Sequence, residues 1–226
     1  MHDPTPAGAA EPAIDPERTL ALLHVPAARR GAIATLWRLD ARLGAVVATT
    51  TDPSIGAIRL AWWRDALTRL DDAAAPAEPL LQDVAAQLLP HVRGAELAAL
   101  AEGWGAIVEG DPDMLDEYGR GRGGVLFGLA ARVLGGDVGG AAAMGAGWAL
   151  VDLGWGQRDA AFRAAALDAA ERALAEWDGR TPRGLRPLGM LAVLARRDVA
   201  AGPDADRRVG SAGRIAMMLR HRMFGR

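Results

Sequence analysis

The amino-acid sequence lacks two reactive residue types completely. Among its 226 residues there is no cysteine and no lysine, so every strongly basic side chain is an arginine. Without cysteine, the chain cannot form disulfides, thiolate metal sites or a cysteine nucleophile. Without lysine, it cannot form a Schiff base or supply the lysine of a P-loop. These absences exclude enzymes that depend on a cysteine nucleophile, a lysine Schiff base or a P-loop lysine.

Long apolar runs and a strong net charge are also missing. The longest uncharged run, 138–151, is rich in glycine and alanine and is shorter than the roughly 20 apolar residues that span a bilayer. The net charge of −2 gives no overall field that would attract nucleic acid. Residues 1–14 contain prolines but no apolar signal-peptide core, and we interpret them as a disordered leader. We expect a cytoplasmic protein or one peripheral to a membrane.

The residues that are present favour helices. Alanine leads the apolar residues, whereas valine, isoleucine and aromatic residues are few. Aspartate followed by proline, which supplies an N-cap and a first helical residue, occurs at Asp15-Pro16, Asp52-Pro53 and Asp111-Pro112. No alternating strand pattern is found. The sequence predicts an all-α protein of about nine or ten helices, with residues 15–226 in one domain.

The stretch 52–67 is expected to form a central scaffold helix. Apolar residues at helical spacing predict one buried face, which would contain Ile55, Ile58, Trp62, Ala66 and Leu70. Adjacent residues point in different directions on a helix, so Trp63 needs a second packing surface or a cation–π contact with Arg59. A helix that is apolar around so much of its circumference is expected inside a bundle.

The glycine-rich segment 119–124 matches the dinucleotide-binding pattern G-x-G-x-x-G. That pattern requires a preceding strand, whereas a capped helix start precedes it here, so we interpret the match as accidental. The glycines are expected to bend a helix or to admit a close neighbour. Arg120 and Arg122 are expected to be a solvated pair, with anion binding as the alternative.

Three aspartates are candidates for a buried or metal-binding role. Asp40 lies in line with an apolar helical stripe, Asp152 lies within a nearly apolar helix, and Asp159 follows it. A buried carboxylate must be paired, bind a metal or stay protonated. Pairing with arginine is favoured, and Mg²⁺ binding remains open. The four histidines are scattered and predict no metal site.

The last predicted helix, about 206–224, is basic and amphipathic. From Arg207 to Arg226 the chain has no acidic residue, and apolar residues alternate with the arginines. This pattern is typical of helices that bind a membrane surface or a partner. Docking on its own bundle explains the pattern equally well.

Several segments in this order resemble the squalene/phytoene synthase family. The resemblance runs from about Arg18 to Asp159 and rests on short motifs: Pro26 with Arg29-Arg30, the segment 58–67, Leu115-Asp116-Glu117-Tyr118, Gly124-Val125-Leu126-Phe127-Gly128, and Gly147-Trp148-Ala149-Leu150 leading to Arg158-Asp159. The family fold is the all-α isoprenoid synthase type I bundle, which agrees with the composition.

The resemblance also implies a metal site that this chain departs from. In active members, two aspartate-rich motifs on facing helices bind Mg²⁺, which holds the diphosphates of two prenyl substrates. Here Asp40 is followed one turn later by Gly44, and Asp159 is followed by Arg163. Each motif therefore keeps at most one carboxylate. Asp159, in the second motif, is the residue suggested as a metal ligand, and Mg²⁺ is implied only if the protein is active.

The resemblance supplies the candidate site residues. The catalytic candidates are Asp40, Tyr118, Asp152 and Asp159, and the diphosphate-binding candidates are Arg29, Arg30 and Arg158.

Two functional interpretations follow. The favoured one is a catalytically degenerate protein that binds prenyl groups or lipids, or that assembles a membrane complex. It is similar to the family branch that includes an assembly factor of respiratory complex I. Such a protein would contact the inner membrane or one of its proteins through the Arg207–Arg226 helix. The alternative is a divergent Mg²⁺-dependent prenyltransferase that condenses prenyl diphosphates.

Overall fold

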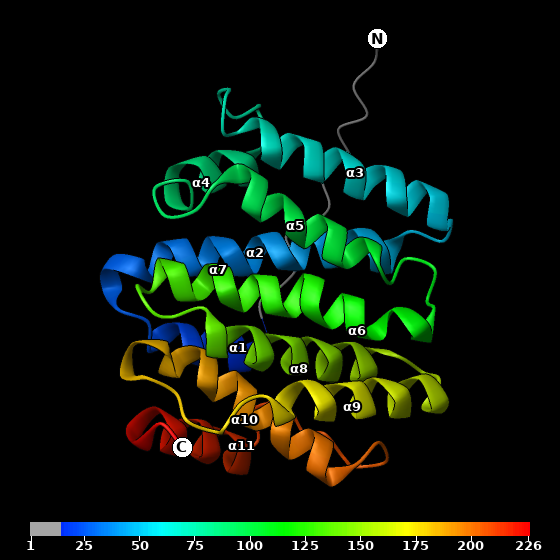
Figure 1. Cartoon of the computed structure of the whole chain (residues 1–226), viewed down its shortest axis with the longest axis vertical. Coiled ribbons are helices and arrows are strands. Elements are labelled where there is room, and N and C mark those ends of the chain that lie inside the picture. The colour runs from blue at the N-terminus through cyan, green and yellow to red at the C-terminus, as the bar shows by residue number, and fades with distance from the viewer. Residues whose placement is uncertain (1–14) are drawn as a thin grey trace.

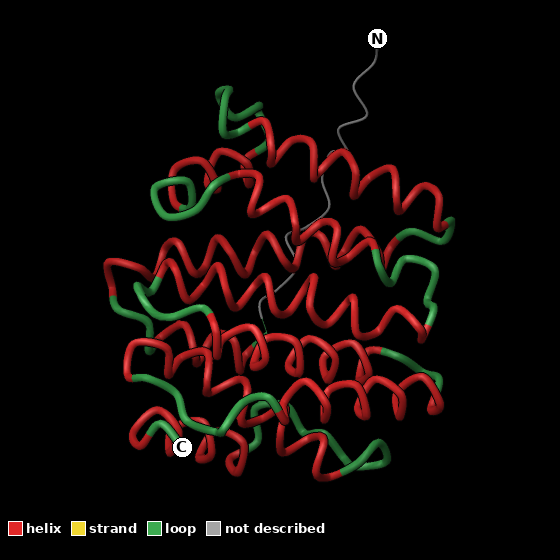
Figure 2. The backbone as a smooth tube through the Cα atoms, in the orientation of Figure 1, coloured by secondary structure: helices red, strands yellow, loops and turns green. Residues whose placement is uncertain are grey.

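The computed structural model describes residues 15–226, which form helices and connecting loops without a strand (Figures 1 and 2). The leader expected at residues 1–14 lies outside the described residues. The prediction of an all-α fold is confirmed. The α-helices and shorter helical turns, in chain order, are α1 (Pro16–Leu23), α2 (Ala27–Thr49), α3 (Pro53–Arg69), α4 (Pro79–Gln87), α5 (Gly94–Gly105), η1 (Pro112–Met114), α6 (Leu115–Tyr118), η2 (Gly119–Gly124), α7 (Val125–Val133), α8 (Gly139–Gly156), α9 (Ala160–Ala175), η3 (Arg183–Leu185), α10 (Arg186–Ala201) and α11 (Ala212–Phe224).

The capping signals act as the sequence predicts. The side chain of Asp15 accepts from the backbone N–H groups of Glu17 and Arg18, and Asp52 caps α3 in the same way. Asp111 starts the short 3₁₀ turn η1, from which the chain continues through α6, the π-helix η2 and α7. Counting α6, η2 and α7 as one continuous helix gives ten helices over 15–226.

The last helix begins later than predicted. It starts at Ala212 rather than near Asp206. The backbone of Gly210 has a positive φ of 72°, which a helix cannot continue through, and its N–H donates to the Glu17 carboxylate. A long-range contact therefore sets this boundary, and the local pattern could not reveal it.

The position predicted for α3 is wrong, and the predicted buried face is right only for Ala66 and Leu70. Figure 1 shows α3 at one end of the stack of helices and α11 at the other, so α3 is not central. Its buried side chains are Leu60, Trp63, Ala66 and Leu67, together with Gly56. The expected core residues Ile55, Ile58 and Trp62 are exposed. Arg59 donates to Thr50 instead of stacking on Trp63. The helix is apolar on two sides, and packing against α5 decides which one is buried.

The glycine-rich segment admits a close neighbour, as predicted. A Cβ atom on Gly123 would lie 2.0 Å from the carbonyl oxygen of Gly145 on α8, and one on Gly121 would meet Gly103 of α5 at 2.8 Å. The backbone of the π-helix η2 therefore touches helices on two sides. This packing fixes the direction of the arginine between the two glycines, Arg122.

The first helix connects α11, at one end of the stack, to α2. Glu17 accepts from Nε and Nη2 of Arg214 on α11, at 2.6 and 2.9 Å. Its neighbour Arg18 donates to Asp40 on α2 at 2.9 Å. Arg214 also pairs with Asp198 of α10. Two consecutive residues of α1 therefore belong to two separate buried ion networks.

One buried histidine gives a testable pH dependence. His221 of α11 lies against Thr181 and Trp177. Burial, and the nearby arginines Arg186, Arg196 and Arg220, lower the pKa of His221 to about 4. As the pH falls, the unfolded chain takes up this proton near pH 6.5, before the folded protein does. The stability that neutral His221 contributes is therefore complete above about pH 6.5 and is lost as the pH falls towards 4.

We expect this histidine to account for about 2–3 kcal/mol of the fall in unfolding free energy between pH 7 and pH 4. Urea unfolding at a series of pH values should show a flatter profile for His221→Gln. The matched change at the half-buried His91, which packs beside Arg29, should flatten the profile much less. Equal slopes for all three proteins would contradict the prediction.

Candidate functional site

The candidate site is centred on the fully buried carboxylate of Asp40 in α2. Its Oδ1 accepts from Nε of Arg122 at 2.9 Å and from Nε1 of Trp104 at 3.0 Å. Its Oδ2 accepts from Nη2 of Arg18 at 2.9 Å and from Nη2 of Arg122 at 3.0 Å. Four donors therefore surround the two oxygens, and pairing with arginine, the favoured expectation for this aspartate, is observed.

Arg122 extends the network to α8. Its Nη2 also donates to Oδ2 of Asp152 on α8 at 2.9 Å, and its Nη1 donates to the hydroxyl of Tyr118. The residues Arg18, Asp40, Arg122 and Asp152 form what we call the Asp40 cluster. Two positive and two negative side chains alternate in it, so the cluster is neutral as a whole. Arg122 joins the two helices that carry the aspartates.

Aromatic rings enclose the two arginines of the cluster. The guanidinium carbon of Arg122 lies 4.1 Å from the ring centre of Trp104 and 5.0 Å from that of Trp148. The guanidinium carbon of Arg18 lies 4.4 Å from the ring centre of Trp148. Guanidinium groups that are stacked on rings and paired with carboxylates are held in one geometry. The cluster is therefore a packed element of the core.

The electrostatics keep the side chains of Asp40 and Arg122 ionised. Burial alone would raise the pKa of Asp40, but the guanidinium groups of Arg122 and Arg18 outweigh it and hold the pKa at about 2. For Arg122, burial opposes the charged form, and Asp40 nevertheless raises its pKa further. Burial raises the pKa of Tyr118 well above its usual value, so its phenol stays protonated at neutral pH. None of these groups is poised to exchange a proton near pH 7.

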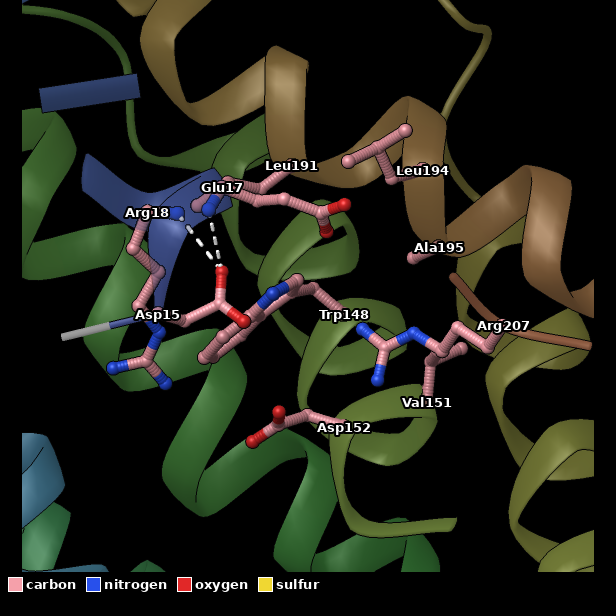
Figure 3. Close-up of a pocket in the computed structure, with 10 residues that line it drawn as sticks. All are labelled: Asp15, Glu17, Arg18, Trp148, Val151, Asp152, Leu191, Leu194, Ala195 and Arg207. Atoms are coloured by element: carbon pink, nitrogen blue, oxygen red, sulfur yellow. Dashed lines mark hydrogen bonds between the residues drawn. The ribbon is translucent and has the colours of Figure 1, made fainter. Parts of the chain in front are cut away.

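A small cavity lies beside Asp152, between α1, α8 and α10. Figure 3 shows Glu17, Arg18 and Arg207 around it, with Trp148 and Asp152 contributed by α8. Its volume of about 10 Å³ is close to the minimum that holds one water molecule. A prenyl diphosphate could not enter this cavity unless the helices around it moved.

The remaining candidate carboxylate takes no part in the cluster. Asp159 is the N-cap of α9, where its side chain accepts from the N–H groups of Ala161 and Phe162. Arg163, one turn later, donates to backbone carbonyl groups, including that of Gln157 at 2.8 Å. Both side chains hold the start of α9 in place. Asp159 and Arg163 therefore both make contacts within or next to α9 and none with Asp40.

The three arginines suggested for diphosphate binding lie elsewhere. Arg29 contacts His91, and Arg30 donates to the backbone carbonyls of Leu23 and Val25. Arg158 is exposed in the connection between α8 and α9. None of them forms a hydrogen bond with Asp40 or Asp152 among the contacts of residues 15–226. The structure brings together Asp40, Tyr118 and Asp152, but not these arginines.

The donor set does not fit the Mg²⁺ that the resemblance implies. The oxygens of Asp40 already accept four hydrogen bonds, and the carboxylate of Asp152 shares the Arg122 guanidinium. No group of three or more acidic, histidine or cysteine side chains suited to a metal is found in the described part of the chain. A hard cation needs several free oxygen ligands, and here a guanidinium occupies the space between the aspartates.

The partners of Asp40 were not identified from the sequence. The sequence predicts a solvated Arg122, and this is wrong, because the side chain is buried and paired with Asp40 of α2. Arg120, by contrast, is exposed and pairs with Glu117. The available signal was the spacing of Tyr118 and Arg122, which places them one turn apart on the same helix face. Small glycines on both sides of Arg122 also indicate close packing.

The protein is an all-α bundle in which α2 and α8 each carry an aspartate, joined by an arginine from the π-helix η2. A family model described as squalene/phytoene synthase matches residues 12–170, which is more than half of the chain. The chain belongs to the squalene/phytoene synthase family. Comparison with curated proteins and with solved structures gave no match.

Proposed function

We propose that this protein is a non-catalytic member of the squalene/phytoene synthase family, which uses the bundle to bind a prenyl or lipid chain or to help assemble a membrane complex. The observation that carries the proposal is the position of Arg122. It places a buried positive charge against Asp40, the carboxylate left in the first aspartate-rich motif. Asp159, the carboxylate left in the second motif, caps α9 instead of facing Asp40 across a metal.

Physical chemistry explains why this arrangement opposes catalysis. Departure of diphosphate requires cations whose coordination positions are open to phosphate oxygens. The Arg122 guanidinium supplies charge, but its donors are used by Asp40, Asp152 and Tyr118. The cavity at the cluster has room for about one water molecule. At the expected reaction centre, the residues therefore leave neither free oxygen ligands for a metal nor space for a substrate.

A different part of the bundle supports a binding role. An open groove of about 790 Å³ lies between α5 and α9, with η2, α7 and α8 as its floor. Small and apolar residues line the floor, among them Gly124, Val125, Gly128, Ala142 and Ala146. Charged residues lie at its edges. This volume lies within the range of small-molecule sites, and the apolar floor suits a hydrocarbon chain.

The alternative, a divergent prenyltransferase, would use arginine rather than metal to hold diphosphate. The arginines near Asp40 are Arg18 and Arg122, and Asp40 engages both. For diphosphate to bind there, it would have to displace a buried carboxylate from two guanidinium groups. This requirement makes the alternative the weaker proposal.

Incubation with radiolabelled farnesyl or geranylgeranyl diphosphate and Mg²⁺ tests the proposal directly. We expect no release of diphosphate and no extractable hydrocarbon above the buffer blank, while an active family member processed in parallel releases both. Mg²⁺-dependent release by this chain that is lost in Asp40→Asn would overturn the proposal.

Ligand binding distinguishes the prenyl-binding role from the assembly role. If the groove holds a prenyl chain, geranylgeraniol should bind about as well as its diphosphate, because no diphosphate site contributes. Ala142→Trp would fill the groove floor and abolish binding, while Ala28→Trp on the exposed side of α2 would not. No binding of either ligand would leave the assembly role as the form of the proposal to retain.

A further inference from the structure

A basic and apolar surface forms where the ends of α1 and α11 meet. One hollow on it is lined by His24, Arg183, Arg186, Arg222 and Met223. A neighbouring hollow is lined by Arg180, Phe224 and Arg226, with the backbone around Thr181. We call these residues, with Leu23 beside His24, the α11-end surface. It combines residues far apart in the sequence.

The arginines of this surface form no ion pair within the part of the chain that the structure describes. Among the ion pairs of residues 15–226, none involves Arg180, Arg183, Arg186, Arg222 or Arg226. The Nε groups of Arg186 and Arg222 are buried and have no hydrogen-bond acceptor. Because these two atoms are shielded from solvent, the donors that a phosphate oxygen can reach are those of the exposed Arg180, Arg183 and Arg226.

Three large apolar side chains project beside these arginines. Leu23, Met223 and Phe224 are 62%, 63% and 61% exposed. They lie at the ends of two helices, and the backbone there is fixed: Arg186 donates to the carbonyl oxygens of Arg222 and Met223, at 3.2 and 2.8 Å. The apolar side chains are therefore held outward by the fold and cannot easily turn back into the core.

The basic part of the C-terminal segment is smaller than the sequence indicated. Arg207 and Arg214 are occupied by Asp198 and Glu17, so they belong to the interior network. The free positive charge is confined to the end of α11 and is joined there by η3 and the turn after α1. Charge and exposed apolar groups therefore coincide on one small area.

We propose that the α11-end surface docks the protein on membranes that contain anionic phospholipids. The exposed guanidinium groups bind lipid phosphates, and Leu23, Met223 and Phe224 enter the boundary between headgroups and acyl chains. A negatively charged membrane satisfies the arginines and covers the apolar side chains at the same time. The inference is independent of whether the bundle retains catalysis.

Sedimentation with vesicles tests this proposal on the full chain. One set contains phosphatidylcholine alone, and the other contains about one-third phosphatidylglycerol. We expect binding to the anionic vesicles only, weakened by about 0.5 M salt because screening shortens the range of the charges. Arg183→Glu with Arg226→Glu should lower the partition coefficient at least about 30-fold, since each surface arginine contributes about a factor of five.

Matched controls separate this surface from general effects of charge or hydrophobicity. Arg69→Glu with Arg158→Glu makes the same change in net charge at two other exposed positions and should leave binding within about threefold. Met223→Ser with Phe224→Ser should weaken binding about tenfold, whereas the equally exposed pair Ile55→Ser with Ile58→Ser on α3 should not. Circular dichroism checks that each variant is folded.

Several results would overturn the proposal. Equal binding to neutral vesicles, no binding to either set, or equal losses in the control variants would show that the α11-end surface does not dock on anionic membranes. Displacement of vesicles by about 10 mM inorganic phosphate would indicate a site for free phosphate, because a multivalent membrane contact resists so weak a competitor. Binding to soluble polyglutamate without vesicle binding would indicate an acidic protein as the occupant.

Discussion

Replacing Arg122 with methionine should lower the free energy of unfolding by about 3–5 kcal/mol, because it leaves the buried Asp40 carboxylate with a single guanidinium partner. Asp152 and the Tyr118 hydroxyl lose a donor in the same change. Methionine fills most of the volume but supplies neither charge nor hydrogen bonds. Chemical denaturation at pH 7 measures the loss.

Two companion variants show whether uncompensated charge is the cause. Arg64→Met removes one partner of an exposed pair with Asp65 on α3 and should cost no more than about 1 kcal/mol. The triple variant Arg18→Met, Asp40→Leu and Arg122→Met removes the buried charges together and should recover much of the loss. A cost below about 1 kcal/mol for Arg122→Met would contradict a tightly coupled cluster.

Arg214→Met should also cost about 3–5 kcal/mol, for the same physical reason at the other network. Arg214 is buried and forms a two-point contact with Glu17, and it also pairs with Asp198. Its loss leaves two buried carboxylates short of a partner and detaches α1 from α11. Thermal and urea unfolding of the variant measure the change.

The effect of Arg214→Met should depend on pH. Burial raises the pKa of Glu17, but the hydrogen bonds from Arg214 and Gly210 outweigh it and lower the folded-state pKa. The stability that Glu17 contributes is therefore present above about pH 4.3 and is lost as the pH falls through its folded-state pKa. The difference between the parent and the variant should shrink below about pH 4.

The exposed pair of Arg208 and Asp206 provides the control for this second network. Arg208→Met should change the unfolding free energy by no more than about 1 kcal/mol at any pH. If Arg208→Met and Arg214→Met lower the free energy of unfolding equally, burial does not determine how much the Arg214 contacts stabilise the protein.

Local signals in the sequence predicted most of the fold. Asp15 and Asp52, each followed by proline, start helices as expected, because capping depends on residues within one turn. The helix α3 shows where such reasoning ends. Both of its apolar faces satisfy the helical period, and only the distant helix α5 determines that Trp63 is buried while Trp62 is exposed.

The site was predictable in kind but not in detail. The position of Asp40 on an apolar stripe indicated a buried carboxylate paired with arginine, and that pairing is found. Which arginine pairs with it could not be inferred, because Arg122 is 82 residues away in the chain. Its direction follows from the close approach of η2 to α5 and α8, which no local pattern describes.

The contact between Glu17 and Arg214 has a consequence for the order of folding. The two residues are separated by 197 positions, close to the largest separation the described chain allows. During synthesis, α1 leaves the ribosome first, yet its buried acid has no partner until α11 has been made. Such distant contacts carry a high loop-closure cost and form late. We therefore expect the growing chain to keep α1 undocked, and the last helix to complete the packing of the first.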